Sequence, residues 1–380
     1  MTKVVVLGCG MVGAAIATDL VGQGLAVTVA DVRQQALDRV KNVDRLTTLR
    51  CDLADPAALS KLIAPFDVVC GALASTLGFQ TLRTVIEAKK SYCDISFMEE
   101  DPLSLDALAK ENGVTAVVDC GVAPGLGNVC AGAVAHELSP CERIDIFVGG
   151  LPQVRSWPFY YKAPYAPTDV FEIYTRPSRV VEHGKIVVKE ALSEPELLEF
   201  AGVGTLEAFN TDGLRSLTTT LKVPFMREKT LRYPGHIELM RVLKHTGFFA
   251  KEPITVGGTK VSPLEVSEAL LLPKWAFAEG EADLTVMRIV GEGTKNGRRV
   301  RRTWDLLDRY DPATKLRSMS RTTAFPASII TGMLARGELS LPGVVPPELL
   351  APKPGFFGQL LAELDKRGVR MSTDTVVLDD

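Results

Sequence analysis

A glycine-rich run near the start of the chain has the spacing of a phosphate-binding loop. Gly8, Gly10 and Gly13 form a G-x-G-x-x-G pattern, with Met11 and Val12 inside it. The pattern follows an apolar run typical of a buried strand and opens a predicted helix. Gly8 permits a tight turn, Gly10 leaves room for a pyrophosphate, and Gly13 lets the helix pack closely on the sheet. These five residues are predicted to hold a dinucleotide at the helix N-terminus; the alternative is that the glycines serve only a tight turn.

An acidic residue at the end of the second predicted strand bears on which dinucleotide is bound. Asp31 stands eighteen residues after Gly13. A carboxylate there accepts hydrogen bonds from the ribose hydroxyls and repels a 2′-phosphate, which favours NAD over NADP. Arg33 follows two residues later and offers a cation for a 2′-phosphate. NAD is therefore the predicted cofactor, with NADP left open.

Four residues that end the next two strands are expected to lie along the cofactor. Asp52 and Leu53 follow the third predicted strand, and Ala72 and Leu73 end the fourth. Asp52 is expected near the adenine edge, and the alternative is an ordinary helix-capping acid. The small residues around Ala72 allow the backbone to run beside the dinucleotide.

A parallel sheet is needed to bring these residues together, and the first 125 residues alternate strand-like and helical patterns. Strands are predicted at residues 4–7, 26–30, 47–51, 67–73, 91–95 and 115–119. Helices are predicted at residues 11–21, 34–40, 56–63, 78–88 and 102–111. This alternation is typical of the α/β class and predicts a Rossmann dinucleotide-binding domain.

The pattern changes after Pro124. A helix is predicted at 126–136, strands at 283–291 and 298–309, and helices at 325–334 and 356–367, while the prolines between 152 and 167 indicate a functional loop. We expect a Rossmann domain of residues 1–124 and 322–380, with an inserted α+β substrate-binding domain of residues 125–321. The active site is expected between the two domains, at the carboxyl ends of the strands. The inserted domain is also expected to form the interface of a homodimer or a larger homo-oligomer.

Composition excludes several other classes of protein. With 43 Lys and Arg against 46 Asp and Glu, the net charge of −3 argues against nucleic-acid binding. No apolar stretch is long enough to cross a membrane. Seven cysteines without a CxxC pair, and a start unlike a signal peptide, indicate reduced thiols in a cytoplasm. The four histidines show no HExxH or zinc spacing, so no metal is expected. The expected partner is a small molecule.

Several runs, in order along nearly the whole chain, resemble the saccharopine dehydrogenase family. They are residues 92–97, 119–128, 148–152, 157–164, 211–215 and 229–236. The Trp-Pro-Phe and Tyr-Pro-Gly-His runs are similar to the lysine 6-dehydrogenases within that family. Members that form saccharopine carry Asp where this chain has Ala123, and Cys where it has Val148. These two differences argue against saccharopine as the substrate.

The resemblance implies NAD-dependent oxidative deamination of the ε-amine of L-lysine. Lysine, NAD and water would give 2-aminoadipate 6-semialdehyde, NADH and ammonia. Hydride leaves carbon 6 only when the neighbouring amine is neutral, and a lysine amine has a pKa near 10.4, so a base or an alkaline medium is required. Two alternatives stay open: a relative that acts on another amino acid or diamine, saccharopine included, and a catalytically silent NAD-binding regulatory protein.

Candidate residues for this chemistry lie in the runs that carry the resemblance. Arg232 and Arg215 are candidates to bind the substrate carboxylate, because guanidinium groups bind carboxylates in a bidentate manner. Lys162 is a candidate base or water activator if it is buried, and an exposed lysine is the alternative. His236 is the histidine best placed for proton transfer, and a packing or capping role is the alternative.

Further candidates concern the charges and methylenes of the substrate. Glu172 and Asp94 are candidates to neutralise its ammonium groups, although each could instead cap a helix or end a strand. Trp157 and Phe159 are expected to line a channel for the lysine methylenes, and Tyr161 in the same run to contact the substrate. Core packing is the alternative for these aromatic side chains.

Overall fold

The computed structural model describes residues 2–163 and 167–378, and the chain divides into two compact units. Unit 1 comprises Met1–Ala133 and Ser320–Arg370, and unit 2 comprises Val134–Met319 and Met371–Asp380. The sequence placed everything after residue 322 in the first domain. The structure differs there because strand β18 (Met371–Val377) pairs with strand β16 (Arg298–Arg309) of unit 2, so backbone hydrogen bonds tie the last strand to that unit.

Unit 1 contains the predicted parallel sheet. Its seven strands have the order β17-β6-β5-β4-β1-β2-β3, and every pairing between them is parallel. The strands are β1 Lys3–Leu7, β2 Ala26–Asp31, β3 Leu46–Arg50, β4 Val68–Gly71, β5 Ser91–Asp94, β6 Thr115–Val117 and β17 Gly343–Val345. The predicted α/β class and Rossmann architecture are confirmed.

Helices alternate with these strands, and local residue chemistry fixes where several of them begin. Asp55 caps α3 by accepting a hydrogen bond from the Ala57 amide at 2.9 Å, and a proline follows the cap. Asp101 begins η1 in the same way. The helices of unit 1 are α1 Met11–Gly22, α2 Gln34–Leu37, α3 Pro56–Ile63, α4 Ser75–Glu87, η1 Pro102–Leu105, α5 Asp106–Glu111, η2 Pro347–Leu349 and α12 Phe356–Lys366. Two helices, α6 Leu126–Glu137 and α11 Ser318–Ala335, cross the boundary between the units.

The core of unit 1 explains why its strands are continuous apolar runs. In β1, Val4 to Leu7 are all fully buried. A parallel strand covered on both faces has no solvent-facing side, so apolar residues are stabilising at every position. Side chains from β1, β4, α3 and α4 share one apolar cluster. At about 25 cal/mol per Å² of buried apolar surface, this cluster is a main source of the stability of the unit.

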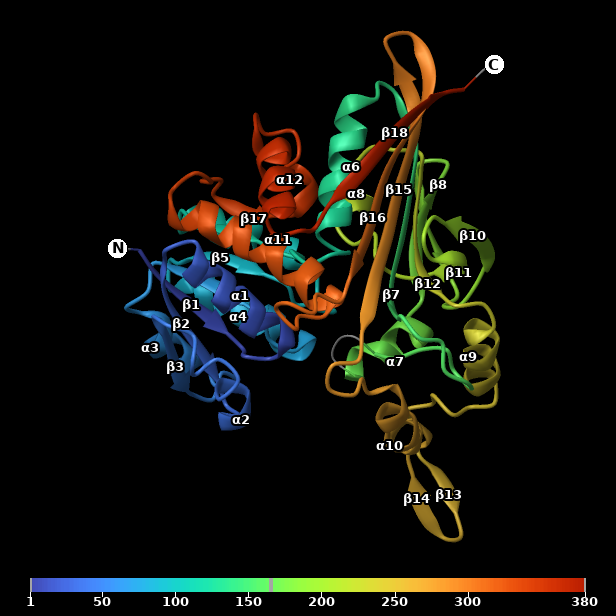
Figure 1. Cartoon of the computed structure of the whole chain (residues 1–380), viewed down its shortest axis with the longest axis horizontal. Coiled ribbons are helices and arrows are strands. Elements are labelled where there is room, and N and C mark those ends of the chain that lie inside the picture. The colour runs from blue at the N-terminus through green and yellow to red at the C-terminus, as the bar shows by residue number, and fades with distance from the viewer. Residues whose placement is uncertain (1, 164–166, 379–380) are drawn as a thin grey trace. The chain divides into compact units, whose positions relative to one another are not determined.

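Unit 2 is built on a nine-stranded mixed sheet. Its main path is β10-β11-β12-β7-β15-β16-β18, and the hairpin β8–β9 pairs with β12. Figure 1 shows the long strands β15 and β16 side by side, and the hairpin β13–β14 beyond α10 at the lower end of this unit. The strands are β7 Cys141–Pro152, β8 Ser178–Glu182, β9 Lys185–Lys189, β10 Glu196–Phe200, β11 Gly204–Asn210, β12 Phe225–Arg232, β13 Ile254–Val256, β14 Thr259–Val261, β15 Asp283–Lys295 and β16 Arg298–Arg309.

The helices of unit 2 are α7 Pro167–Thr175, α8 Leu217–Thr220, α9 His236–His245 and α10 Pro263–Trp275. Side chains of α7, α9 and α10 contribute to one apolar cluster that is rich in aromatic residues. Trp275 is fully buried, and its ring lies 5.7 Å from that of Phe159 and 5.5 Å from that of Tyr161. Across the described ranges, no helix combines the length and apolarity that crossing a membrane would require.

Candidate functional site

The glycine-rich loop of unit 1 has no space for side chains at its first and third glycines. Gly8 has a φ of +96°, and a Cβ atom on it would lie 2.4 Å from the carbonyl oxygen of Ala72. A Cβ atom on Gly13 would lie 2.0 Å from the carbonyl oxygen of Gly8. Both glycines are therefore required by close backbone contacts, in the roles that the sequence predicted for them.

The second glycine differs, because the space beside it is open. Apart from its chain neighbours, no heavy atom of the described residues lies within 4 Å of a Cβ atom built on Gly10. Gly10 is also the N-cap of α1, and no side-chain cap of that helix is found in the described part of the chain. Met11 and Val12 form the first turn. The open space at the N-terminus of a twelve-residue helix suits an anionic group such as a pyrophosphate.

Asp31 is fixed at the end of β2 by hydrogen bonds to the backbone. Its Oδ2 accepts from the Cys9 amide at 2.8 Å, and its Oδ1 accepts from the Arg33 amide at 2.8 Å. The side chain is buried, which opposes ionisation. Hydrogen bonds from the Arg33 side chain and from both amides outweigh burial and hold the pKa of Asp31 below its usual range. Asp31 is therefore a fixed carboxylate beside the glycine-rich loop.

Arg33 lies over this carboxylate and is largely exposed. Its Nε is 3.3 Å from Asp31 Oδ1, and 67% of its side-chain surface is accessible. A guanidinium that is free to move in solvent can turn from Asp31 toward a phosphate without disturbing the fold. Asp31, which disfavours a 2′-phosphate, and Arg33, which favours one, therefore lie next to each other.

The other predicted cofactor residues fall into two groups. Ala72 and Leu73 lie against Gly8, whose added Cβ would be 3.3 Å from Leu73 Cδ2. Asp52 is exposed and closes a turn by accepting a hydrogen bond from the Ala54 amide at 3.0 Å, so it is not the helix cap that the alternative required. Leu53 packs in the apolar core of the unit.

Asp94 occupies a closed polar position at the end of β5. The Ser96 hydroxyl lies 2.7 and 2.6 Å from its two carboxylate oxygens. A Cβ atom on Gly71 would lie 2.3 Å from Asp94 Oδ1, so the glycine leaves space for this carboxylate. Burial raises the pKa of Asp94 to about 6, against the lowering effect of Ser96. Asp94 ends its strand as the structural alternative proposed.

In unit 2, Arg232 is the centre of a buried polar cluster. It is the last residue of β12, and only 1% of its surface is exposed. Its Nε donates a hydrogen bond to the Tyr174 hydroxyl at 3.3 Å, and its Nη1 donates to the Leu231 carbonyl at 2.9 Å. The guanidinium carbon lies 4.4 Å from the centre of the Tyr161 ring. A guanidinium held against aromatic rings is rigid and weakly solvated, which suits the binding of a carboxylate.

His236 supports this arginine from the start of α9. Its Nε2 lies 2.9 Å from the Tyr174 hydroxyl, and its Nδ1 lies 2.8 Å from the Phe159 carbonyl oxygen. A carbonyl only accepts, so Nδ1 carries the proton and Nε2 accepts from Tyr174. Burial, helped by the charge of Arg232, lowers the pKa of His236 to about 3. This arrangement disfavours the predicted proton transfer near pH 7, because the imidazole stays neutral and both of its nitrogens are engaged.

The remaining predicted substrate residues lie elsewhere in unit 2. Lys162 forms an ion pair with Glu281, with 2.6 Å between Nζ and Oε2, so its amine is already engaged by a carboxylate of the protein. Glu172 pairs with Lys251 at 3.2 Å. Trp157 is 82% exposed, so the expectation that it lines a channel is not met in this structure. Arg215 is buried, with a φ of +53°, just before α8. Residue 164, the last of the resembling run 157–164, lies outside the described residues.

Two residues of the cluster escaped the sequence reasoning. Tyr174 connects Arg232 to His236 but lies in α7, outside the runs that carry the resemblance. Glu228 is buried on β12, four residues before Arg232. The alternation of Glu228, Thr230 and Arg232 along one strand places the three side chains on the same face, and this period of two was the signal available in the sequence.

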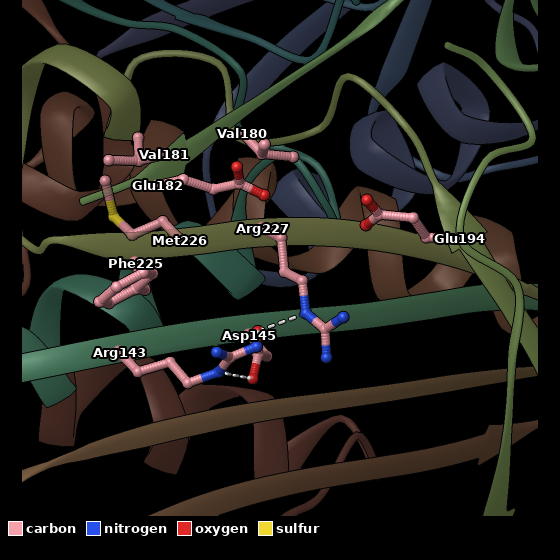
Figure 2. A pocket seen from close by; sticks show the side chains of 9 residues that line it. All are labelled: Arg143, Asp145, Val180, Val181, Glu182, Glu194, Phe225, Met226 and Arg227. Carbon is pink, nitrogen blue, oxygen red and sulfur yellow. Dashed lines mark hydrogen bonds and ion pairs between the residues drawn. The ribbon is translucent and has the colours of Figure 1, made fainter. Parts of the chain in front are cut away.

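A pocket opens on the opposite side of β12, among paired charges. Figure 2 shows Asp145 between two arginines: Arg227 Nε lies 2.6 Å from Oδ1 and Arg143 Nε lies 2.6 Å from Oδ2. The pocket is lined by Arg143, Asp145, Val180, Val181, Glu182, Glu194, Phe225, Met226 and Arg227. None of these is a predicted site residue. Asp145 pairs with both arginines, and Glu182 and Glu194 pair with Lys189, so the charges of the pocket are already compensated and it does not compete with the Arg232 cluster as a substrate site.

Two family models match the chain, one after the other. Residues 4–117 match the model of the saccharopine dehydrogenase NADP binding domain. Residues 121–369 match that of the saccharopine dehydrogenase C-terminal domain.

Relatives and a solved structure agree with these matches. The chain is 25% identical to the alpha-aminoadipic semialdehyde synthase of Arabidopsis thaliana over 58% of its own length, and it spans only 22% of that protein. It is 21% identical to the NADP(+), L-glutamate-forming saccharopine dehydrogenase of Schizosaccharomyces pombe, over 89% of this chain and 90% of that one. The structure of apo saccharopine dehydrogenase (L-Glu forming) from Saccharomyces cerevisiae matches with a TM-score of 0.81 at 19% identity, covering 99% and 100% of the two chains. The fold is shared with that enzyme.

Proposed function

This chain belongs to the saccharopine dehydrogenase family, and we propose that within it the protein oxidises the ε-amine of L-lysine with NAD. The products would be 2-aminoadipate 6-semialdehyde, NADH and ammonia. The family makes the protein an oxidoreductase with a domain that binds a nicotinamide dinucleotide. The lysine substrate and the choice of NAD are our proposal, as is the assembly of several copies.

The glycine-rich loop fits the dinucleotide. Gly10 leaves open space at the N-terminus of α1, and the fixed carboxylate of Asp31 stands beside the same loop. When bound, the dinucleotide supplies the acceptor for the hydride. The loop would hold its pyrophosphate through backbone amides, and Asp31 would accept hydrogen bonds from the adenosine ribose.

The buried arginine of unit 2 is the single observation that carries the amino-acid substrate. Arg232 is held by Tyr174 and lies over the ring of Tyr161, so its donors are oriented before any ligand arrives. We propose that Arg232 binds the α-carboxylate of lysine, and that Tyr174 and His236 position it.

Saccharopine is the second candidate substrate, because a relative that covers 89% of this chain is named a saccharopine dehydrogenase. Two positions count against it. Ala123 and Val148 stand where the saccharopine-forming members resemble one another in carrying Asp and Cys. The apolar side chains of Ala123 and Val148 lack the polar groups that those members carry, so we propose lysine ahead of saccharopine.

The test is to incubate the purified protein with L-lysine and follow NADH and ammonia together between pH 7 and pH 10.5. Equal amounts of both products are expected with lysine and NAD, with weaker or no turnover on saccharopine. Faster NADP reduction would overturn the cofactor proposal. Turnover of saccharopine alone would identify the second candidate, and no turnover with any amine would indicate a dinucleotide-binding protein without this activity.

The cofactor choice has its own variant. Replacing Arg33 with alanine removes the only feature of the loop that we expect to favour a 2′-phosphate, while leaving Asp31 bound to the Cys9 amide. If NAD is the cofactor, the KM for NAD should change less than about twofold, because the guanidinium is exposed and its ion pair is weak. If Arg33→Ala loses activity with NADP but keeps its activity with NAD, then Arg33 binds the 2′-phosphate of NADP.

A further inference from the structure

A buried carboxylate on β12 has no role in the proposal so far. Glu228 is 3% exposed, and its Oε2 accepts hydrogen bonds from the Thr211 hydroxyl and from the Gly213 amide, the latter at 3.1 Å. A Cβ atom on Gly213 would lie 2.5 Å from the carboxyl carbon of Glu228. The Thr211 hydroxyl also lies 2.9 Å from that of Thr230. The chain therefore leaves a space shaped for this carboxylate and fixes one of its oxygens.

The other carboxylate oxygen of Glu228, Oε1, differs from Oε2 in its hydrogen bonds. Among the described residues, both hydrogen bonds to the Glu228 carboxylate reach Oε2, and none reaches Oε1. Oε1 is not among the fully buried side-chain oxygens that lack a partner, so it keeps accessible surface through which a ligand can reach it. Since a carboxylate accepts hydrogen bonds, the missing partner is a donor, and an ammonium group is the donor that also matches its charge.

The position of Glu228 relative to Arg232 suits the two ends of lysine. The residues lie four apart on one face of β12, so their Cα atoms are about 13 Å apart along the strand. Lysine carries its carboxylate and its ε-ammonium at opposite ends of a chain of four methylenes. A substrate held by Arg232 at the carboxylate and directed along the strand would bring its ε-nitrogen toward Glu228.

Neither base predicted from the sequence is available for that nitrogen. Lys162 is paired with Glu281. His236 is held on both nitrogens by Tyr174 and by the Phe159 carbonyl. Glu228 is the acidic residue of the Arg232 face that remains able to accept a proton.

We propose that Glu228 is the base that accepts a proton from the ε-ammonium of bound lysine. The inference rests on the proposed function. In this step one N–H bond of the ammonium breaks and an O–H bond forms at Oε1, while the electron pair stays on nitrogen. The products are a neutral amine and a neutral carboxylic acid, and no electrons are transferred. The lone pair then assists the departure of hydride from carbon 6.

The charges around Glu228 suit this task at neutral pH. Burial raises the pKa of Glu228 to about 7, against the lowering effect of Thr211 and the Gly213 amide. Asp212, which pairs with Arg179, raises this pKa further, and Arg232 lowers it. A base whose pKa lies near the working pH is ionised often enough to act and basic enough to take the proton. Activity should therefore fall as the pH drops below about 7, where Glu228 becomes protonated.

The experiment compares the wild type with Glu228→Gln over pH 6 to 10.5, measuring kcat/KM for lysine. Glutamine keeps the size of the side chain and removes the base. We expect a loss of about 100-fold to 1,000-fold at pH 7.5. We also expect recovery to within about tenfold near pH 10.4, where free lysine loses its ε-proton in solution. Glu199→Gln, an exposed carboxylate of β10 in the same sheet, should match the wild type.

A second variant protects the test against misfolding. Thr211→Val removes one hydrogen bond that lowers the pKa of Glu228, so the acidic limb of the pH profile should move to higher pH while activity at pH 9 stays within about tenfold. A wild-type pH profile in both variants would overturn the role of Glu228 and leave the lysine reaction standing. A loss in Glu228→Gln that is the same at every pH would also overturn it. Absence of lysine turnover in the wild type would overturn the proposed function and this inference together.

Discussion

The glycine-rich loop of unit 1 and the Arg232 cluster of unit 2 are two candidate binding regions, and they are built from different parts of the polypeptide. In the glycine-rich loop of unit 1, the candidate site is formed by the backbone. Gly8 and Gly13 make close backbone contacts, and Gly10 leaves space at the N-terminus of α1. In the Arg232 cluster of unit 2, side chains from α7, α9 and β12 converge. The glycine-rich loop is one short stretch of sequence, whereas the Arg232 cluster is assembled from segments almost 60 residues apart.

This difference predicts how each region responds to substitution. A backbone site depends on the absence of side chains, so adding a single methyl group can block it. A side-chain site depends on a network of hydrogen bonds, so its members can be removed one at a time with graded effects. The predictions below test this contrast.

The largest effect is expected from Gly10→Ala. Gly10 has a φ of −68° and a ψ of −168°, which alanine adopts without strain, and the space around its Cβ position is open among the described residues. The fold should therefore be kept, whereas the methyl group would occupy the space of the pyrophosphate. We expect dinucleotide affinity to fall by about 100-fold or more. Fluorescence titration with NADH measures it.

The matched control is Gly22→Ala in the last turn of the same helix. Gly22 also has open space around its Cβ position in the described structure. Alanine there should change the free energy of unfolding by about 1 kcal/mol or less and leave NADH binding intact. Equal affinity in both variants would mean that the open space at Gly10 does not hold the dinucleotide.

The same contrast explains how much could be predicted from the sequence. The loop was predictable because its chemistry follows from glycine spacing between a strand and a helix, and all six predicted strands of the first 125 residues are present. The seventh strand, β17, was missed because Gly343–Val345 is three residues long and lies in a proline-rich segment. Its partner β6 is more than 200 residues earlier, and such a pairing leaves no local pattern.

The substrate cluster was only partly predictable. Arg232 and His236 were found through the resemblance, but not their connection, because Tyr174 lies 58 residues before Arg232 and joins them only in the fold. Burial reversed the expectation for His236, since the sequence cannot reveal that a histidine is fully enclosed beside an arginine. The exposure of Trp157 is the opposite case, an aromatic residue in a resembling run that the fold leaves in solvent.

Removal of Arg232 is expected to have the next largest effect. Arg232→Ala should lower kcat/KM for lysine by about 100-fold, because a charged hydrogen-bonding partner of the carboxylate is lost. The KM for NAD should change less than about threefold, since the loop lies in the other unit. Steady-state kinetics with each substrate varied in turn separate the two constants.

Arg227→Ala is a control on the same strand. Arg227 lies on the opposite face of β12, where it pairs with Asp145 at 2.6 Å (Figure 2). It also pairs with Glu196 at 3.0 Å. Its loss should lower stability slightly and leave the KM for lysine within about twofold of the wild type. Similar losses in both arginine variants would mean that general destabilisation, and not carboxylate binding, explains the effect of Arg232→Ala.

A smaller effect on activity than that of Arg232→Ala is expected from His236→Gln, and this variant separates positioning from proton transfer. If His236 only orients Tyr174, then kcat/KM for lysine should fall by about fivefold or less and the acidic limb of the pH profile should stay in place. If kcat/KM instead falls by about 100-fold and the acidic limb of the pH profile disappears, then His236 takes part in proton transfer.

Stability provides a second measurement of the same residue, with a definite sign. The pKa of His236 is about 3 in the folded protein and near 6.5 when the chain is unfolded. Between these values the unfolded state binds the proton and the folded state does not, so this histidine lowers stability as the pH falls from 6.5 toward 3. In urea unfolding, the free-energy difference between the wild type and His236→Gln should therefore be smaller at pH 4.5 than at pH 7, by up to about 1.4 kcal/mol per pH unit. Glu228 and Asp94 titrate in both proteins and cancel from this difference, so a gap that does not depend on pH would show that His236 is not the enclosed neutral imidazole on which the positioning role depends.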